Sequence, residues 1–591
     1  MFDKNTLIGM GLILVLLFGY TYYTQPTKEE IAASQHKKDS ITMLKKNIAI
    51  IDSLKLITPK DTVGTTANKT NYNGLFNGTV ADEKFVLEND LISISLNSKG
   101  GHPTAVLLKE YKTSKGFPFQ ILNNKNDYWE LEFNATDQTI NTKNIYFQKI
   151  ESTPTSLLLR AYADSQKTKY IQYKYNLKPN NYLVDFEITL EKMEELIPRQ
   201  AGYFNFNWVQ TLQVAEHDIS MERTNSTIYF KEEEVDYLSE TKNEVSTELR
   251  NASWLSYKQQ FFNNTLINKS GFEEGKTSLG YITDDTTYLK KCESKLVMRY
   301  DNAATASYPM QWYIGPNNYK ELKLMGIELQ RILPFGWGIF GWCNKYFILP
   351  LFSFLQNIFS SYGLIILMLT IIIKLITFPL TYKSYVASAK MKLLKPEIDK
   401  LKARYKDDPQ TLQMEQMKVQ SKSGVNPLGG CLPQLVQMPV WIALYRFFPA
   451  SIEFRQQPFL WASDLSNFDS IFQIAGYHIS LFCVLFCISQ LLMTWYMTKT
   501  TDIPDQMKYM QYFFPFMMFF FLNSTSAGLN WYLFAGNIVT FILQYVSLNY
   551  IIDTTKLQNQ MEENKKKPAK KSLFQQKMEE AVKQRQSQSK K

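Results

Sequence analysis

The chain has 591 residues, of which 45% are hydrophobic, 14% aromatic and 20% charged, with a formal net charge of +10. Ordinary glycine and proline counts, together with abundant aromatic residues, exclude a collagen-like rod and a globally disordered chain. Five scattered cysteines are too few for a disulfide scaffold, and the length predicts several domains.

Long apolar runs predict a membrane protein with six spans. Residues 6–23 carry no charge and no A-x-A cleavage site follows closely, so we interpret 1–23 as an N-terminal transmembrane anchor, although a signal peptide competes with it. A polar tether follows over 24–72. The other spans are expected at 362–382, 431–448, 479–497, 509–522 and 529–550, of which 509–522 is short.

The charge of the connecting segments predicts the orientation. The segment 383–424 carries ten basic and five acidic residues, and the tail 551–591 carries eleven and five. The loop 449–478 carries one and three, the region 24–344 carries 37 and 39, and the connection 498–508 is balanced. The positive-inside rule then places both termini in the cytoplasm and the large soluble region in the periplasm of a bacterial inner membrane.

Residues 73–334 predict a large periplasmic all-β sandwich. Ile92, Ile94 and Leu96 alternate with polar residues, and the segment 184–190 does the same, as in half-buried antiparallel strands. Its many tyrosines either pack sheet faces, which we favour, or line a sugar or peptide cleft. The aromatic segment 335–361 predicts an interfacial amphipathic helix.

Motifs for covalent chemistry are missing from the sequence. It contains no G-x-x-x-x-G-K-[ST], no H-E-x-x-H and no G-x-S-x-G, and its four histidines are dispersed. A Ser–Lys protease is disfavoured because Ser384 and Ser388 lie ten and fourteen residues beyond Lys374. We therefore expect no enzyme, and no bound cofactor or metal.

Lys374 is the one ionisable residue in the middle of a predicted span. A charge at bilayer depth costs about 2.5–3.5 kcal/mol, so Lys374 either snorkels to an interface or lines a wet cavity. Thr370 lies one turn earlier on the same face. Polar residues on other spans complete the expected pocket: Gln434, Gln437, Ser489, Gln490, Asn530, Tyr532, Asn537, Thr540 and Gln544. Since these segments contain no acidic residue, the pocket should prefer anionic or polar chain segments.

The segment 383–424 predicts a cytoplasmic helical hairpin. Met391, Leu394, Ile398, Leu401 and Tyr405 form one apolar stripe, and Asp408-Pro409 is a helix start with Asp408 as N-cap. The hairpin is either a solvated helix pair or a partner docking site, and the basic tail is expected to bind anionic lipid or RNA. The candidate docking residues are Lys390, Lys392, Lys400, Lys402, Arg404, Lys565, Lys566 and Lys567.

The stretch from Asn426 to Tyr445, with N-P-L-G-G-C-L-P followed by Q-M-P and A-L-Y, resembles the third-span signature of the YidC family of membrane protein insertases. Its surroundings are also similar: F-P-L-T at 378–381, R-Q-Q-P-F at 455–459 and A-G-L at 527–529. The likeness covers about 335–552, and more weakly the soluble region.

The resemblance implies an α-helical core of five helices, with the N-terminal anchor and a large periplasmic domain added. It further implies a groove open to the cytoplasm and to lipid, whose basic residue, here Lys374, attracts an acidic or polar substrate segment. Thr370, Gln437 and Tyr532 are expected to line it, with Gln434 and Asn537. The implied partners are nascent membrane proteins, the Sec translocon, membrane lipid, and the ribosome and targeting machinery.

Two other functions stay open from the residues alone. A secondary transporter or channel for a small anion would need an inverted repeat with broken helices, and the sequence shows no internal repeat. A passive envelope scaffold would depend on the β-domain, so deleting about 75–330 would distinguish it from an insertase.

Overall fold

The computed structural model describes residues 75–76, 83–135, 138–198, 202–282, 285–406, 408–425, 432–474, 477–500 and 505–566. The predicted anchor 1–23, the tether 24–72 and the end of the basic tail, including Lys567, lie outside the described residues.

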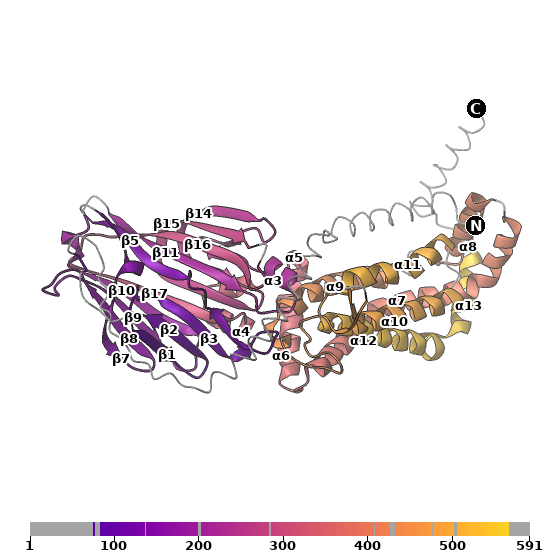
Figure 1. The fold of residues 1–591 in the computed structure, drawn as a ribbon. Coiled ribbons are helices and arrows are strands. Elements are labelled where there is room, and N and C mark those ends of the chain that lie inside the picture. The colour runs from indigo at the N-terminus through magenta and orange to yellow at the C-terminus, as the bar shows by residue number, and fades with distance from the viewer. Residues whose placement is uncertain are drawn as a thin grey trace, which may run out of the picture. The chain divides into compact units, whose positions relative to one another are not determined.

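The predicted β-domain consists of two antiparallel sheets around one apolar core (Figure 1). The smaller sheet has the order β1-β2-β3-β4, with β1 Lys84–Glu88, β2 Ile92–Asn97, β3 Pro103–Lys112 and β4 Pro118–Leu122. The predicted alternation is confirmed in β2, because Ile92, Ile94 and Leu96 are buried.

The larger sheet has thirteen strands within the described residues. The order of neighbouring strands is β6-β5-β11-β16-β15-β17-β10-β9-β8-β7. In addition, β14 pairs with β15 and with β12, and β13 pairs with β12. The strands are β5 Tyr128–Ala135, β6 Gln138–Asn141, β7 Gln148–Ser152, β8 Ser156–Tyr162, β9 Tyr170–Leu177, β10 Leu183–Glu191, β11 Tyr203–Gln213, β12 Thr227–Lys231, β13 Val235–Tyr237, β14 Glu244–Lys258, β15 Phe262–Tyr281, β16 Tyr288–Arg299 and β17 Thr305–Pro316. Tyr173, Tyr175 and Tyr257 are fully buried in the core, in agreement with a packing role for these tyrosines.

Short helices follow the sheets. The helix α3 (Ile219–Thr224) lies between β11 and β12, and α4 (Tyr319–Leu324) follows β17. The predicted interfacial segment forms α5 (Gly338–Cys343), the π-helical turn η4 (Asn344–Ile348) and α6 (Leu349–Gln356). Its place at the membrane interface stays a prediction. Large apolar side chains are exposed along it: Trp337, Ile339, Trp342, Tyr346 and Phe354.

The predicted spans after residue 361 fall on helices, except that residues 479 and 480 belong to strand β19 and residue 431 lies outside the described residues. The helices are α7 Tyr362–Arg404, α8 Pro409–Lys422, α9 Leu432–Ala450, α10 Leu481–Thr500, α11 Asp505–Leu522, α12 Ala527–Val546 with the π-helical turn η7 (Ser547–Ile551), and α13 Thr554–Lys566. A short pair, β18 (Ser470–Ile474) and β19 (Tyr477–Ser480), precedes α10.

By length and apolarity, three described segments are able to cross a bilayer: α7, the Leu481–Thr498 part of α10, and Ala527–Ile551. The count of six spans therefore stays a prediction. The helix α7 runs without a break through the predicted boundary at 382, so one 43-residue helix forms both the apolar segment and the first arm of the hairpin. Asp408 caps α8 as predicted, because its Oδ1 accepts a hydrogen bond of 3.1 Å from the Thr411 amide.

Candidate functional site

Lys374 lies in α7, and its ammonium is held from a second helix. Its Nζ donates a hydrogen bond of 2.9 Å to Oε1 of Gln437 on α9. The lysine side chain is partly exposed, whereas the preceding Ile373 is buried. An ammonium has three N–H donors, and within the described residues Gln437 is its one hydrogen-bond partner. Two donors therefore remain for water or for a passing polar group.

The aliphatic stem of Lys374 packs against a glycine of α12. A Cβ atom built on Gly536 would lie 3.5 Å from Cε and 3.9 Å from Nζ of Lys374. The lysine therefore crosses the backbone of α12 at close range, which a small residue permits. Gly536 was not among the predicted groove residues, although a glycine inside an apolar span is the signal of such a close approach.

Thr370 lies on the same face of α7 but does not present its hydroxyl to Lys374. Its Oγ1 donates a hydrogen bond of 2.7 Å to the carbonyl of Ile366, one turn earlier on the same helix. Its Cγ2 methyl lies 3.8 Å from the Cβ position of Gly536. Thr370 is fully buried, so it fills the space beside the lysine stem.

The other predicted groove residues are placed less directly. Tyr532, one turn before Gly536 on α12, is buried, with its ring centroid 6.3 Å from that of Phe448. Asn537 faces a different helix, because its Nδ2 donates a hydrogen bond of 2.9 Å to Oγ of Ser489 on α10. The side chain of Gln434 lies outside the described residues.

Lys374 lies at a boundary in packing density. Toward the α6 end of the bundle, residues of α7, α9 and α12 are buried together: Ile366, Leu369, Ala443, Leu444, Phe447, Phe448 and Leu529. Toward the hairpin end, the next turns expose apolar side chains: Leu375, Ile376, Met438, Ile538, Phe541 and Ile542. The cation thus marks the end of this buried cluster on α7, and a second, smaller cluster around Tyr385 and Ala389 lies farther toward the hairpin.

The dense side is built largely from aromatic rings. Phe447, Phe448 and Phe454 contact one another, with centroid distances of 5.0–5.8 Å. Phe352 of α6 joins them at 5.4 Å from Phe447. The indole of Trp531 on α12 donates a hydrogen bond of 2.9 Å to the carbonyl of Gly363. The few buried polar side chains on that side are bonded to backbone carbonyls, as Asn344 is to Ala443 and Asn530 to Leu522.

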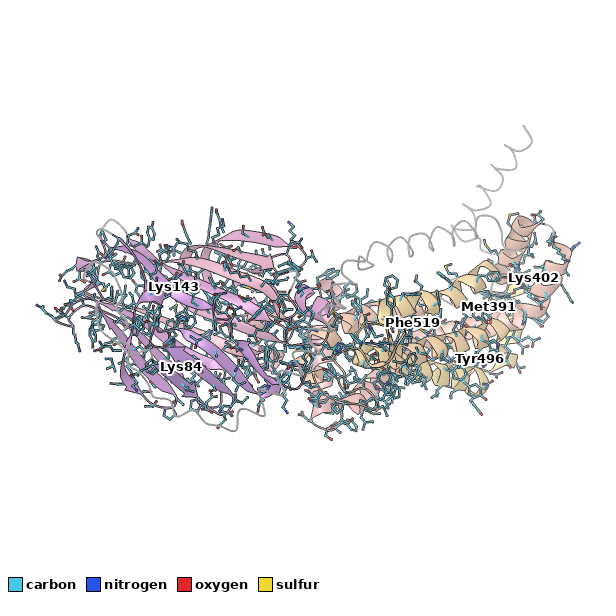
Figure 2. All side chains as sticks on the ribbon, in the orientation of Figure 1. Lys84, Lys143, Met391, Lys402, Tyr496 and Phe519 are labelled. Carbon is cyan, nitrogen blue, oxygen red and sulfur yellow. The ribbon has the colours of Figure 1, made fainter. Side chains whose placement is uncertain are left out.

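The candidate docking cations within the described residues lie on α7 and α13. Figure 2 shows Met391 and Lys402 toward the hairpin end of α7. Lys392, Lys400 and Arg404 are exposed there, and Lys390 is partly exposed. The structure brings the C-terminal helix to the same place, because Lys565 of α13 forms an ion pair with Glu397 of α7.

Two family models match the chain. The model described as "YidC periplasmic domain" matches residues 84–349, and the one described as "60Kd inner membrane protein" matches residues 354–555. The first covers the β-domain and the interfacial segment up to the start of α6, and the second covers the helical part from the end of α6 onward.

Curated relatives match along nearly the whole chain. A membrane protein insertase YidC of Parabacteroides distasonis is 33% identical over 98% of this chain and 97% of its own length. One of Phocaeicola vulgatus is 34% identical over 91% and 90%.

Solved structures match with low TM-scores. A crystal structure titled as an active YidC insertase covers 85% of this chain and 99% of its own, with 16% identity and a TM-score of 0.35. A galactose mutarotase related enzyme from Lactobacillus acidophilus covers 39% of this chain and 97% of its own, with 10% identity and a TM-score of 0.29. Full-length identity and both family models carry the assignment: the chain belongs to the YidC family of membrane protein insertases.

Proposed function

We propose that this insertase admits the polar segment of a nascent membrane protein into a hydrated groove beside Lys374. Moving such a segment through hydrocarbon is costly because its hydrogen bonds go unmet. Water and a fixed positive charge inside the bundle shorten the dry distance and favour acidic segments. The apolar span of the substrate then partitions into lipid, which releases about 25 cal/mol per Å2 buried.

One observation carries this proposal. The ammonium of Lys374 lies inside the bundle, is held by Gln437, and stands where the buried core ends. A lysine that snorkels to an interface extends away from its neighbours, whereas this side chain crosses Gly536 toward α9. Thr370, Gln437 and Tyr532 would shape the wall of the groove, and Gln434 and Asn537 would extend it.

We also propose the setting in which this groove works. The hairpin and both termini face the cytoplasm, and the β-domain faces the periplasm of the inner membrane, as the charge distribution predicts. The basic hairpin and tail receive the ribosome or targeting machinery, and the chain acts alone or beside the Sec translocon. It needs no cofactor, and no covalent bond is made or broken.

Crosslinking to a stalled nascent membrane protein tests the groove. A photoreactive residue at Thr377, one turn from Lys374 toward the hairpin, should crosslink to the substrate's polar segment. The matched control is Leu364, an exposed position on the same helix at its α6 end. Several-fold stronger crosslinks from Thr377 support the proposal, and equal crosslinks from both positions contradict it.

A further inference from the structure

An apolar groove at the hairpin end of α7 is covered by α13, the last helix within the described residues. The floor of this hairpin groove is formed by Leu394 and Ile398 of α7 and by Val425, all buried. Gly424, with φ +68°, ends α8, and the Val425 amide donates a hydrogen bond of 2.8 Å to the carbonyl of Gln420. This helix end turns the chain so that Val425 packs against α7.

The cover is α13, which presents one narrow apolar face. Leu557 and Met561, one turn apart, are its buried residues: Met561 belongs to the same apolar cluster as the floor, and Leu557 packs in the neighbouring cluster with Tyr385 and Ala389 of α7. Asp553 caps the helix by accepting hydrogen bonds of 3.0 Å from the amides of Thr555 and Lys556. The ion pair of Lys565 with Glu397 fastens the far end. The geometry is that of an amphipathic helix lying in a groove.

The contacts that hold α13 in the hairpin groove are weak enough for another helix to replace it. A helix of thirteen residues is marginal by itself in water, so its order depends on the groove. Its buried apolar side chains number only two, and the surface ion pair of Lys565 with Glu397 contributes little. The remaining face of α13 is exposed.

The net charge of the α7 segment along the hairpin groove differs from that of α13, which covers the groove. Residues 390–404 of α7 carry six basic and two acidic residues, a net +4. Residues 553–566 carry three acidic and three basic residues, a net charge of zero. A more acidic helix with the same apolar pair would therefore bind this rim more strongly than α13 does.

We propose that the hairpin groove is a docking surface for an acidic amphipathic helix of another protein, and that α13 occupies it in cis until that helix displaces it. The partner's helix carries two apolar residues one turn apart, in the manner of Leu557 and Met561. This inference does not depend on the groove at Lys374.

Peptide binding to the full-length chain tests the exchange. Leu557→Asp with Met561→Asp should release α13, and Gln560→Asp, at an exposed position on the same helix, is the matched control. A labelled peptide of residues 553–566 should bind the released variant about tenfold more tightly than the control variant, a difference set by removing the cis competitor. Adding Ile398→Asp to the released variant should abolish binding.

Two peptide variants test the chemistry of the partner. The peptide with Lys556→Glu should bind the released chain more tightly than the unchanged peptide, and salt should reduce that gain. A peptide with both apolar residues changed to Asp should not bind. Equal binding to released and control chains, or binding that survives Ile398→Asp, overturns the proposal.

A disulfide provides a reversible lock on the same chain. The Cβ position at residue 424 lies 3.8 Å from Cβ of Asn564, which is within the range of disulfides. Gly424→Cys with Asn564→Cys should exclude the Lys556→Glu peptide when oxidised and admit it again when reduced. If the oxidised and reduced forms bind it equally, α13 does not cover the docking surface.

Discussion

Replacing Lys374 by arginine, methionine and glutamate separates its charge from its shape. An ammonium and a carboxylate about 4 Å apart attract each other by about 4 kcal/mol at an effective dielectric constant of 20. The lysine is partly exposed, so screening by water reduces this attraction to about 1–2 kcal/mol. The charge is therefore expected to change the insertion of an acidic segment by roughly 5–30-fold.

The assay uses two substrates that differ only in the exported tail, one acidic and one neutral. Insertion into proteoliposomes is followed by protease protection of the tail. Lys374→Arg should keep the preference for the acidic tail, Lys374→Met should lose it, and Lys374→Glu should reverse it. The neutral tail is the internal control for folding of each variant.

Two outcomes would refute the reasoning about charge. If Lys374→Glu inserts the acidic tail as well as the wild type does, attraction by the ammonium has no part in the reaction. If Lys374→Met slows both tails equally, the lysine acts through the structure of the bundle, including its hydrogen bond with Gln437.

Substitutions at three further positions test other parts of the structure. Gly536→Ala should be tolerated, because its Cβ meets Lys374 at ordinary contact distance, whereas Gly536→Leu should displace the lysine and lower acidic-tail insertion about as Lys374→Met does. Gly363→Ala should destabilise the bundle by about 1–3 kcal/mol in thermal unfolding, because its Cβ would lie 1.9 Å from the ring of Phe459. Burial raises the pKa of Asp127 to about 7, so its contribution to stability is complete below pH 4 and is lost as the pH rises through 7. Asp127→Asn should remove this dependence, worth about 4 kcal/mol, from denaturant unfolding of the β-domain at pH 4 and 7.

Local patterns predicted the elements but not their pairing. The alternation of Ile92, Ile94 and Leu96 fixes a strand with one buried face, and β2 has that face in the core. The division into sheets of four and thirteen strands depends on contacts between segments far apart in the chain, such as β10 with β17. Periodicity within one strand carries no information about its neighbour.

The helical boundaries show a second limit. Hydropathy marks where an apolar surface ends, and it ends near residue 382, but a helix continues as long as its backbone hydrogen bonds do. The helix α7 therefore runs to Arg404 although the sequence indicates a boundary. The stripe of Leu394 and Ile398 was visible in the sequence, but its cover was not, because α13 follows about 160 residues later and has only Leu557 and Met561 on its buried face.

The sequence predicted that the site holds a positive charge, but it did not predict which side chains contact that charge. An isolated lysine in a span is conspicuous, and polar residues such as Gln437 on other spans are natural partners for it. The sequence did not indicate which of nine polar residues meets the ammonium, since side-chain reach across a bundle depends on helix rotation. It also gave no weight to Gly536, whose missing side chain decides the path of the lysine.

The contacts of Lys374 together favour a site that holds a substrate briefly. One hydrogen bond to a neutral amide fixes the ammonium without neutralising it, whereas a carboxylate partner would cancel the field that attracts an acidic segment. On the α6 side of the lysine the buried residues are apolar and largely aromatic, a lining that does not favour water. A polar segment drawn to this point therefore meets charge on one side and an apolar core on the other. Its onward movement must then come from partitioning of the adjoining apolar span into lipid, which is the step that the lysine does not oppose.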